Sequence, residues 1–378
     1  MKVDVVLDLG FGDGGKGTMV DYLTMMSPSS SKLIVRFSGG PQAGHTVWRQ
    51  DGRKHVFSNF GAGSFNENTD TFWSRFCPVD PVGFLREYDI LKSKVPDAGP
   101  WSYVDVNCPI ITPYDKAFNQ SDNLTHGTCG VGIRPTLVRE ERLYSLKVGD
   151  LSFPQIFIQK YLLIKKYYGD YTSWKLQDEG FWHTCFRYMK HILPWDSPGL
   201  PDYRHYIFEG SQGLLLDPKH GFFPHVTSTD VDLTNVYKLL PPGTPFNTHL
   251  VTRAYQTRHG NGPMFDKDID KFQIIENQEE TNITNKYQGD LRRNYLSLEY
   301  LMYALTRLDS KLNFKLLVSC VDQMKDNYCI YDFDGALLKF ESANDFLTYL
   351  TKELRSIRSI SEVYANVSPY TETIYKWQ

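Results

Sequence analysis

The sequence predicts an α/β fold with a large, mostly parallel central sheet flanked by helices. Short apolar runs rich in β-branched residues recur along the 378 residues, and glycine or polar residues follow them. Such runs are typical of strands that are buried on both faces. The first run leads directly into a P-loop-like glycine turn, which reads GFGDGGKGT from Gly10 to Thr18. A strand followed by such a turn and a helix is the usual arrangement of a phosphate-binding α/β unit.

The composition fits one soluble domain that spans residues 1–378. Hydrophobic residues make up 41% and charged residues 22% of the chain, as in ordinary globular proteins. A net charge of -3 does not favour binding to nucleic acid. No run approaches the roughly 18 apolar residues that a membrane span requires, and the six cysteines show no CxxC spacing. We therefore expect a cytoplasmic protein with reduced thiols that binds neither membrane nor nucleic acid.

The elements follow from local patterns. Strands are predicted at residues 3–9, 33–37, 206–208, 248–252 and 314–318. Helices are predicted at residues 16–26, 153–168, 180–191, 295–308 and 343–356. Residues 38–46 and the polar residues 276–294 are predicted to be loops that carry function.

The turn at residues 10–18 suits an anion. Its glycines allow close approach of the backbone, the following helix start offers N–H groups, and Lys16 and Thr18 add a charge and a hydroxyl. The spacing is not that of a Walker A loop, which disfavours a P-loop kinase. Asp13 within the turn needs an explanation, because a carboxylate among phosphates is costly unless it binds a metal or takes a proton.

A second candidate group is His45, which follows a glycine-rich stretch after the strand at 33–37. Open α/β sheets bind ligands beyond the carboxyl ends of their strands. Asp13 and His45 there would form an acid–base pair that removes one proton and stabilises phosphate charge. Further glycine-punctuated polar segments, each able to hold an anion, are residues 127–132, 209–213 and 226–230.

These residues resemble adenylosuccinate synthetase, a family that joins L-aspartate to the 6-position of a 6-oxopurine nucleotide at the expense of a nucleoside triphosphate. The matching segments, in order, are residues 11–17, 39–46, 127–132, 147–151, 208–213, 223–228, 257–263 and 371–374.

The resemblance implies a mechanism with Asp13, His45 and Lys16 as catalytic residues. Asp13 takes the proton from purine N1 and, with the carbonyl of Gly44, binds Mg²⁺. The 6-oxygen attacks the γ-phosphate while His45 stabilises the transferring group, and the amine of aspartate then displaces the 6-phosphoryl group.

The resemblance also implies the binding residues and a homodimer. The triphosphate would contact Gly12, Gly14, Gly15, Lys16, Gly17, Thr18, Gly44, His45 and Thr46, and its base Asp322, Ser368 and Pro369. The purine monophosphate would contact Asp13, Gln42, Thr128, Cys129, Arg142, Gln212, Thr227 and His259. Arg292 and Arg293 would bind aspartate.

The sequence departs from the family pattern at several positions. Where the family has glutamate after the motif aspartate, this sequence has Gly14, which would leave room beside Asp13 for a purine 2-amino group. In the family homodimer, an arginine from the partner subunit reaches the 5′-phosphate of the purine nucleotide. The matching position in this sequence is Leu143, so Arg142 or Arg139 would substitute. Cys320 replaces the lysine of the guanine-reading segment, so ATP or dATP is as compatible as GTP.

Two acceptors remain open. Asp8-Leu9, Pro41 and the 291–293 segment resemble the phage-type branch, which makes N6-succino-2-amino-deoxyadenylate from dGMP for 2-aminoadenine DNA in the host cytoplasm. That branch usually has serine in place of the catalytic aspartate, so Asp13 favours IMP. We expect dGMP, with IMP and GTP as the alternative. A nucleotide-binding module without catalysis is the competing class of function.

Overall fold

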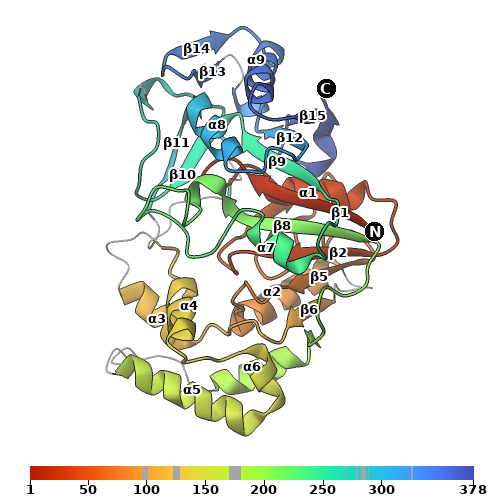
Figure 1. The fold of residues 1–378 in the computed structure, drawn as a ribbon, viewed down its shortest axis with the longest axis vertical. Coiled ribbons are helices and arrows are strands. Elements are labelled where there is room, and N and C mark those ends of the chain that lie inside the picture. The colour runs from red at the N-terminus through yellow and green to blue at the C-terminus, as the bar shows by residue number, and fades with distance from the viewer. Residues whose placement is uncertain are drawn as a thin grey trace.

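The computed structural model describes residues 1–95, 101–121, 128–169, 180–267, 269–277, 280–281, 287, 289–324 and 327–378. Within these ranges ten strands form a central sheet (Figure 1). In spatial order they are β16 (Ile374–Lys376), β15 (Ile360–Asn366), β12 (Phe314–Ser319), β9 (Asn247–Arg253), β1 (Lys2–Asp8), β8 (His205–Gly213), β2 (Lys32–Arg36), β5 (Thr69–Trp73), β6 (Ser102–Asp105) and β7 (Leu193–Trp195). Neighbouring strands run parallel except β16, which is antiparallel to β15. The predicted fold class and the five predicted strands are confirmed.

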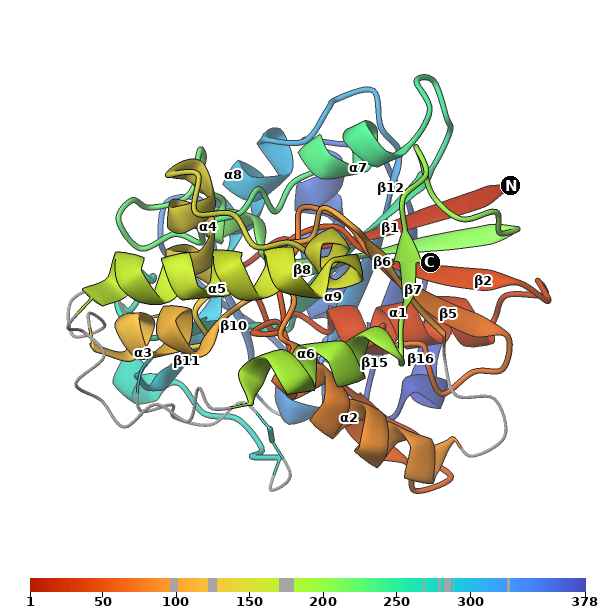
Figure 2. The ribbon, with the colours of Figure 1, turned by 90° about the horizontal axis from the view of Figure 1, so that it is seen from below.

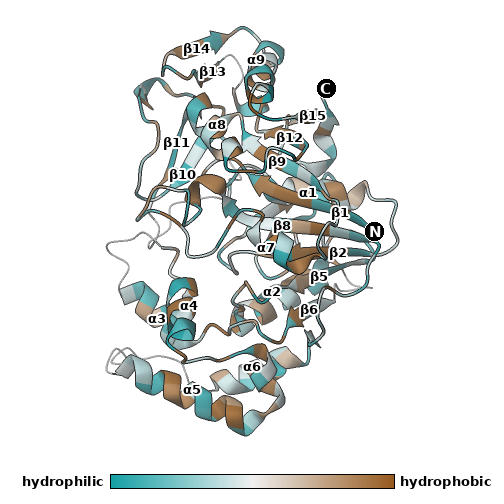
Figure 3. Cartoon of the chain, in the orientation of Figure 1, coloured by the Kyte–Doolittle hydropathy of each residue, from teal (hydrophilic) through white to brown (hydrophobic). Residues whose placement is uncertain are grey.

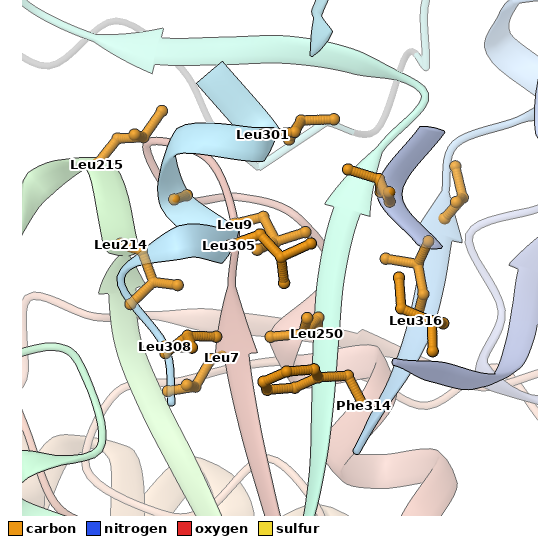
Figure 4. Close-up of a cluster of buried hydrophobic side chains, with 14 of the residues drawn as sticks. Leu7, Leu9, Leu214, Leu215, Leu250, Leu301, Leu305, Leu308, Phe314 and Leu316 are labelled. Atoms are coloured by element: carbon orange, nitrogen blue, oxygen red, sulfur yellow. The ribbon is translucent and has the colours of Figure 1, made fainter. Parts of the chain in front are cut away.

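Helices cover both faces of this sheet, because alternate side chains of its central strands enter two different cores. Val5 and Leu7 of β1 pack in one core, and Val6 packs in the other. The first core also holds residues of α7 (Thr234–Leu239), α8 (Leu298–Thr306) and α9 (Ala343–Arg355). Figure 4 shows Leu301 and Leu305 of α8 above Leu7 and Leu250.

The second core lies against α1 (Lys16–Met25), α2 (Pro81–Lys94), α5 (Pro154–Tyr168) and α6 (Phe181–Met189). Helices α3 (Pro113–Ser121) and α4 (Ile133–Glu141) lie beside α5, as the view in Figure 2 shows. In Figure 3, α5 carries alternating hydrophobic and hydrophilic bands, as predicted for a half-buried surface helix.

A second, smaller sheet contains β10 (Tyr255–His259), β11 (Leu291–Ser297), β13 (Tyr328–Tyr331) and β14 (Leu337–Phe340), and β3 (His45–Trp48) with β4 (Lys54–Phe57) forms a hairpin. Three predictions of the sequence analysis are corrected by these elements. His45 and Thr46 belong to a strand, and so do Arg292 and Arg293 of β11, rather than to loops. The helix predicted from residue 295 begins at Leu298, because Ser297 caps it by accepting a hydrogen bond from the Tyr300 N–H.

The carboxyl ends of the parallel strands bring distant segments together. Asp13 follows β1, the loop to His45 follows β2, and Arg253 ends β9. Asp322 follows β12, and Ser368 follows β15. Because these strands are neighbours in the sheet, their carboxyl ends form one site. In the described part of the chain, no helix is long and apolar enough to cross a membrane.

Candidate active site

The glycine turn is held by buried charges. Lys16, the first residue of α1, is buried, and its Nζ lies 3.0 Å from Oδ2 of Asp8, the last residue of β1. Gly17 has to be glycine, since a Cβ there would come within 2.7 Å of the His45 Cβ. This close contact sets the start of α1 directly against β3. Lys16 and His45 therefore face one cleft.

Asp13 adopts left-handed backbone geometry, with φ of 61°. Its carboxylate is 24% exposed, and Oδ2 lies 3.1 Å from Nε2 of His259. Burial acts to raise the pKa of Asp13, but the hydrogen bond from His259 and the charges of His259, Arg253 and Lys16 together lower it to about 2. The carboxylate is consequently ionised at neutral pH and faces the cleft.

His45 is oriented by a buried glutamate. Its Nδ1 forms a short hydrogen bond with Oε1 of Glu209, and Nε2 lies 3.3 Å from the Ser211 carbonyl oxygen. Glu209 is fully buried, accepts a hydrogen bond from the Ala62 N–H and lies 3.8 Å from Arg36. Burial acts to raise the pKa of Glu209, but the Arg36 charge and the His45 hydrogen bond bring it below its ordinary value. Burial, with the charges of Lys16 and Arg36, also lowers the pKa of His45.

Most of the residues expected to bind a triphosphate share this cleft, which encloses about 870 Å³ of space including solvent. The predicted residues that line it are Asp13, Gly15, Lys16, Gly17, Thr18, Gly44, His45, Thr46, Asp322, Ser368 and Pro369. Gly12 and Gly14 instead line a small cavity behind the turn.

The far end of the cleft suits a base. Asp322 begins a short 3₁₀ helix (Asp322–Met324), and burial raises its pKa. Ser368 is hydrogen-bonded to Thr373, and Trp48 of β3 packs edge-on against Tyr370. Carboxylate, hydroxyl and aromatic groups at this end can recognise a purine.

Apart from Asp13, the residues expected to bind the purine monophosphate do not line this cleft. Thr229 accepts a hydrogen bond from the Gly39 N–H, and a Cβ on Gly39 would meet the Ser211 Cβ at 2.5 Å. The loops bearing Gln42, Gln212 and Thr227 are therefore packed together. Ile133 at the start of α4 contacts this group at Gly40, close in sequence to Thr128 and Cys129. Gly127 of the same motif lies outside the described residues.

The two arginines proposed as substitutes for Leu143 differ. Arg139 is fully buried and paired with Asp115 at 2.9 Å, so it cannot reach a ligand, and that alternative is wrong. Arg142 is exposed and donates to the Tyr167 hydroxyl on α5.

The expected aspartate-binding arginines lie next to each other on β11, opposite β10. Arg292 donates to the Gly262 carbonyl, and burial lowers its pKa. Arg293 donates through Nη1 to both carboxylate oxygens of the exposed Glu276, at 2.9 and 2.7 Å. Because successive side chains of a strand point to opposite faces, the two guanidinium groups lie on different faces of β11, Arg292 beside Gly262 and Arg293 beside Glu276.

The sequence analysis did not assign the roles that the structure gives to three charged residues near the cleft. Arg253 lines the cleft and donates through Nε to the Asp13 carbonyl at 2.6 Å and through Nη1 to Glu280 at 3.0 Å. Glu209 holds His45, and Asp8 holds Lys16. Each is a charged residue within or at the end of an apolar strand run, a signal that marks a functional or paired group.

Comparison with known proteins identifies the family. The sequence profile described as "Adenylosuccinate synthetase" matches residues 5–376. The chain belongs to the adenylosuccinate synthetase family. The adenylosuccinate synthetase of Acidithiobacillus ferrooxidans is 29% identical over 279 residues, and that of Pseudomonas fluorescens SBW25 is 31% identical over 278. Each alignment covers 68% of this chain and 64% of the relative, so the chain aligns with slightly less than two thirds of these adenylosuccinate synthetases.

Solved structures agree on the fold. The fully ligated adenylosuccinate synthetase of Plasmodium falciparum superimposes with a TM-score of 0.78 at 18% identity, with all of both chains covered. The succinoaminodeoxyadenylate synthetase of cyanophage S-2L, bound to dGMP and dATP as an energy donor, gives a TM-score of 0.69 at 16% identity and covers 99% and 95% of the two chains. The adenylosuccinate synthetase fold is thus present across the described chain.

Proposed function

We propose that this chain is a purine-nucleotide ligase that forms a C–N bond between the amine of L-aspartate and C6 of a 6-oxopurine nucleotide. The triphosphate is hydrolysed to diphosphate and phosphate, and the 6-oxygen leaves with the phosphate. The observation that carries the proposal is the cleft in which the Asp13 carboxylate, the His45 imidazole and Lys16 meet.

The chemistry follows from these groups. Asp13 accepts the N1 proton, which places negative charge on O6 and makes this oxygen a nucleophile toward the γ-phosphate. Lys16 and the turn N–H groups bind the phosphates, and His45, whose Nδ1 is held by Glu209, stabilises the transferring phosphoryl group. An anionic phosphate beside Lys16 and Arg253 offsets the charges that lower the pKa of Asp13. Triphosphate binding should therefore make Asp13 a stronger base.

The donor set fits Mg²⁺. Mg²⁺ binds through one or two protein oxygens together with substrate phosphates and water, and the Asp13 carboxylate and the Gly44 backbone both line the cleft. In the described residues there is no cluster of three or more acidic, histidine or cysteine side chains suited to a metal, which is compatible with an ion held mainly by the nucleotide. Bound there, Mg²⁺ would neutralise charge on the β- and γ-phosphates.

We propose dGMP as the acceptor, giving N6-succino-2-amino-2'-deoxyadenylate. The support is the likeness in fold to the cyanophage protein bound to dGMP and dATP, together with the phage-type features of the sequence. The argument from Gly14 does not hold, since the space that its missing side chain leaves is filled by Asp8. IMP is the second candidate, favoured by the carboxylate of Asp13 and by relatives described as adenylosuccinate synthetases.

ATP or dATP is the proposed donor because Cys320 stands where a lysine of the guanine-reading segment is expected. GTP remains the alternative, since Asp322 lines the cleft and can accept from a guanine edge. Aspartate would bind at Arg292 and Arg293.

A homodimer is proposed from exposed apolar side chains. Leu143 is 89%, Phe153 64%, Ile156 52% and Leu163 55% exposed. The last three lie on or beside α5, and Tyr144 packs on Tyr167 of the same helix. Several exposed large apolar side chains on and beside one helix are compatible with a subunit interface.

The test is an assay of phosphate release and succino-nucleotide formation. Purified protein with L-aspartate and Mg²⁺ is given dGMP or IMP, each with ATP, dATP or GTP. Turnover of dGMP supports the proposal, and turnover of IMP alone assigns the second candidate. If no 6-oxopurine nucleotide reacts while nucleotides still bind, the chain is a binding module without catalysis.

A further inference from the structure

Asp8 connects the two ends of the glycine turn. It is 1% exposed and ends β1. Its Oδ1 accepts from the Gly10 N–H at 2.8 Å, and its Oδ2 accepts from the Gly14 N–H at 2.7 Å and from Lys16 Nζ at 3.0 Å. One carboxylate thus fixes both the backbone of the turn and the lysine that faces the cleft.

Gly14 is required for space rather than for backbone freedom. Its φ is not in the positive range, unlike those of Gly12 and Gly15. A Cβ on Gly14 would lie 2.7 Å from Oδ2 and 3.0 Å from Cγ of Asp8, and 3.2 Å from the Cα of Thr252. The Asp8 carboxylate therefore occupies the space into which any side chain at position 14 would project.

We propose that Asp8 is a positioning residue for Lys16 and that it supplies, from position 8, a carboxylate in place of the glutamate that the family resemblance puts at position 14. The two positions form one unit: either Asp8 with Gly14, or a small residue at 8 with glutamate at 14. The inference rests on the proposed function in one respect, namely that Lys16 binds the triphosphate.

A purely structural cap would behave differently from a positioning residue. Asp4 provides the comparison, because it is equally buried on the same strand. It accepts from His205 at 2.7 Å and from His249 at 2.9 Å, and it does not line the cleft. Asp4→Asn should lower the melting temperature and leave triphosphate affinity unchanged.

The experiment measures melting temperature and the Kd for ATP, dATP and GTP with Mg²⁺ and without any acceptor. The variants are Asp8→Gly, Asp8→Asn, Gly14→Ala, Asp8→Gly/Gly14→Ala and Asp8→Gly/Gly14→Glu. Asp8→Gly and Asp8→Asn should weaken triphosphate binding about tenfold or more, because Lys16 loses its charged partner. Gly14→Ala should weaken it in the wild-type background and have little further effect in Asp8→Gly. The Asp8→Gly/Gly14→Glu double variant should regain most of the affinity.

Two results would overturn the inference. One is wild-type triphosphate affinity in Asp8→Asn with only a lower melting temperature. The other is additive effects of Asp8→Gly and Gly14→Ala, which would mean that the two positions do not share one space. If Asp8→Gly does not fold, the comparison of Asp8→Asn with Asp4→Asn decides. Since these readouts need no acceptor, failure of the ligase assay on wild-type protein would count against the proposed function separately.

Discussion

The Nε2 atom of His259 lies 3.1 Å from Oδ2 of Asp13, so an imidazole from the second sheet meets the carboxylate of the turn that follows β1. Arg253 approaches the same residue from its backbone side, at the Asp13 carbonyl. Two sheets therefore control the charge of one carboxylate. The pKa of about 2 that results describes a base held ionised before substrates bind.

Asp13→Asn tests whether this carboxylate does chemistry. Asparagine keeps the size of the side chain but cannot take the N1 proton, so kcat should fall by about 10²-fold or more while nucleotide Kd changes little. Steady-state kinetics and calorimetric titration measure the two effects. Loss of nucleotide binding in proportion to turnover would point to a binding role only.

His259→Gln tests the control of Asp13 by the second sheet. The folded-state pKa of Asp13 is lowered from 3.8 to about 2, so its charge stabilises the fold above about pH 4 and this contribution is lost as the pH falls toward 2. Removing the imidazole should raise the pKa of Asp13 toward its ordinary value. The free energy of unfolding should then decrease less as the pH falls. Urea unfolding between pH 2 and pH 5 measures it, with the exposed His183→Gln as control. If the free energy of unfolding depends on acidic pH in the same way in His259→Gln and in wild type, His259 does not lower the pKa of Asp13.

Glu209→Gln tests the orientation of His45. The amide cannot hold the Nδ1 proton as a carboxylate does, so kcat should fall about 10-fold or more with little change in KM. Glu87→Gln is the matched control, because Glu87 is a buried glutamate that accepts from the Asn59 N–H and pairs with His55, which, unlike His45, does not line the cleft. A decrease in thermal stability is expected in both variants, and a selective loss of kcat only in Glu209→Gln. Equal kinetics in the two variants would exclude a catalytic effect of the His45–Glu209 pair.

The sequence patterns predicted five of the ten described strands of the central sheet, namely β1, β2, β8, β9 and β12, but none of the second sheet. Strands such as β1 and β9 are buried on both faces, so their apolar runs stand out. In β10 and β11 the residues Thr257, Arg258, Arg292 and Arg293 interrupt any apolar run. These strands were missed because they carry polar groups toward a site.

The site was predictable in its local part only. The glycine turn and His45 follow from motif and position, because each lies within one short segment. The pairs Asp8–Lys16, His45–Glu209 and Asp13–His259 join residues that are 8, 164 and 246 positions apart. The two longer pairs depend on which strands are neighbours, and the 2.7 Å conflict between a side chain at 14 and Asp8 depends on the exact path of the turn. Neither can be deduced from composition or spacing.

Arg292→Leu tests aspartate recognition. Loss of a guanidinium that binds a carboxylate should raise the KM for aspartate about tenfold or more, while the KM values for both nucleotides stay near wild type. Arg292→Lys should recover only part of the loss, because lysine lacks the planar fork. Arg307→Leu, an exposed arginine stacked on Tyr303, is the control. A uniform rise of all three KM values in Arg292→Leu would mean a general disturbance of β11.

Arg142→Leu tests the proposed homodimer through its site. Arg142 is exposed on the α4–α5 side and donates to the Tyr167 hydroxyl, and by the family resemblance we propose that it contacts the monophosphate of a partner subunit. Arg142→Leu should raise the KM for the monophosphate about tenfold or more, and Arg187→Leu on α6, exposed as well, should not.

The decisive measurement mixes Asp13→Asn with Arg142→Leu protein. In a mixed dimer the Arg142→Leu subunit keeps its own Asp13 and receives Arg142 from its partner, so activity at low monophosphate should return to roughly a quarter of wild type after random reassortment. If the mixture is no more active than the sum of its parts, Arg142 does not act across subunits.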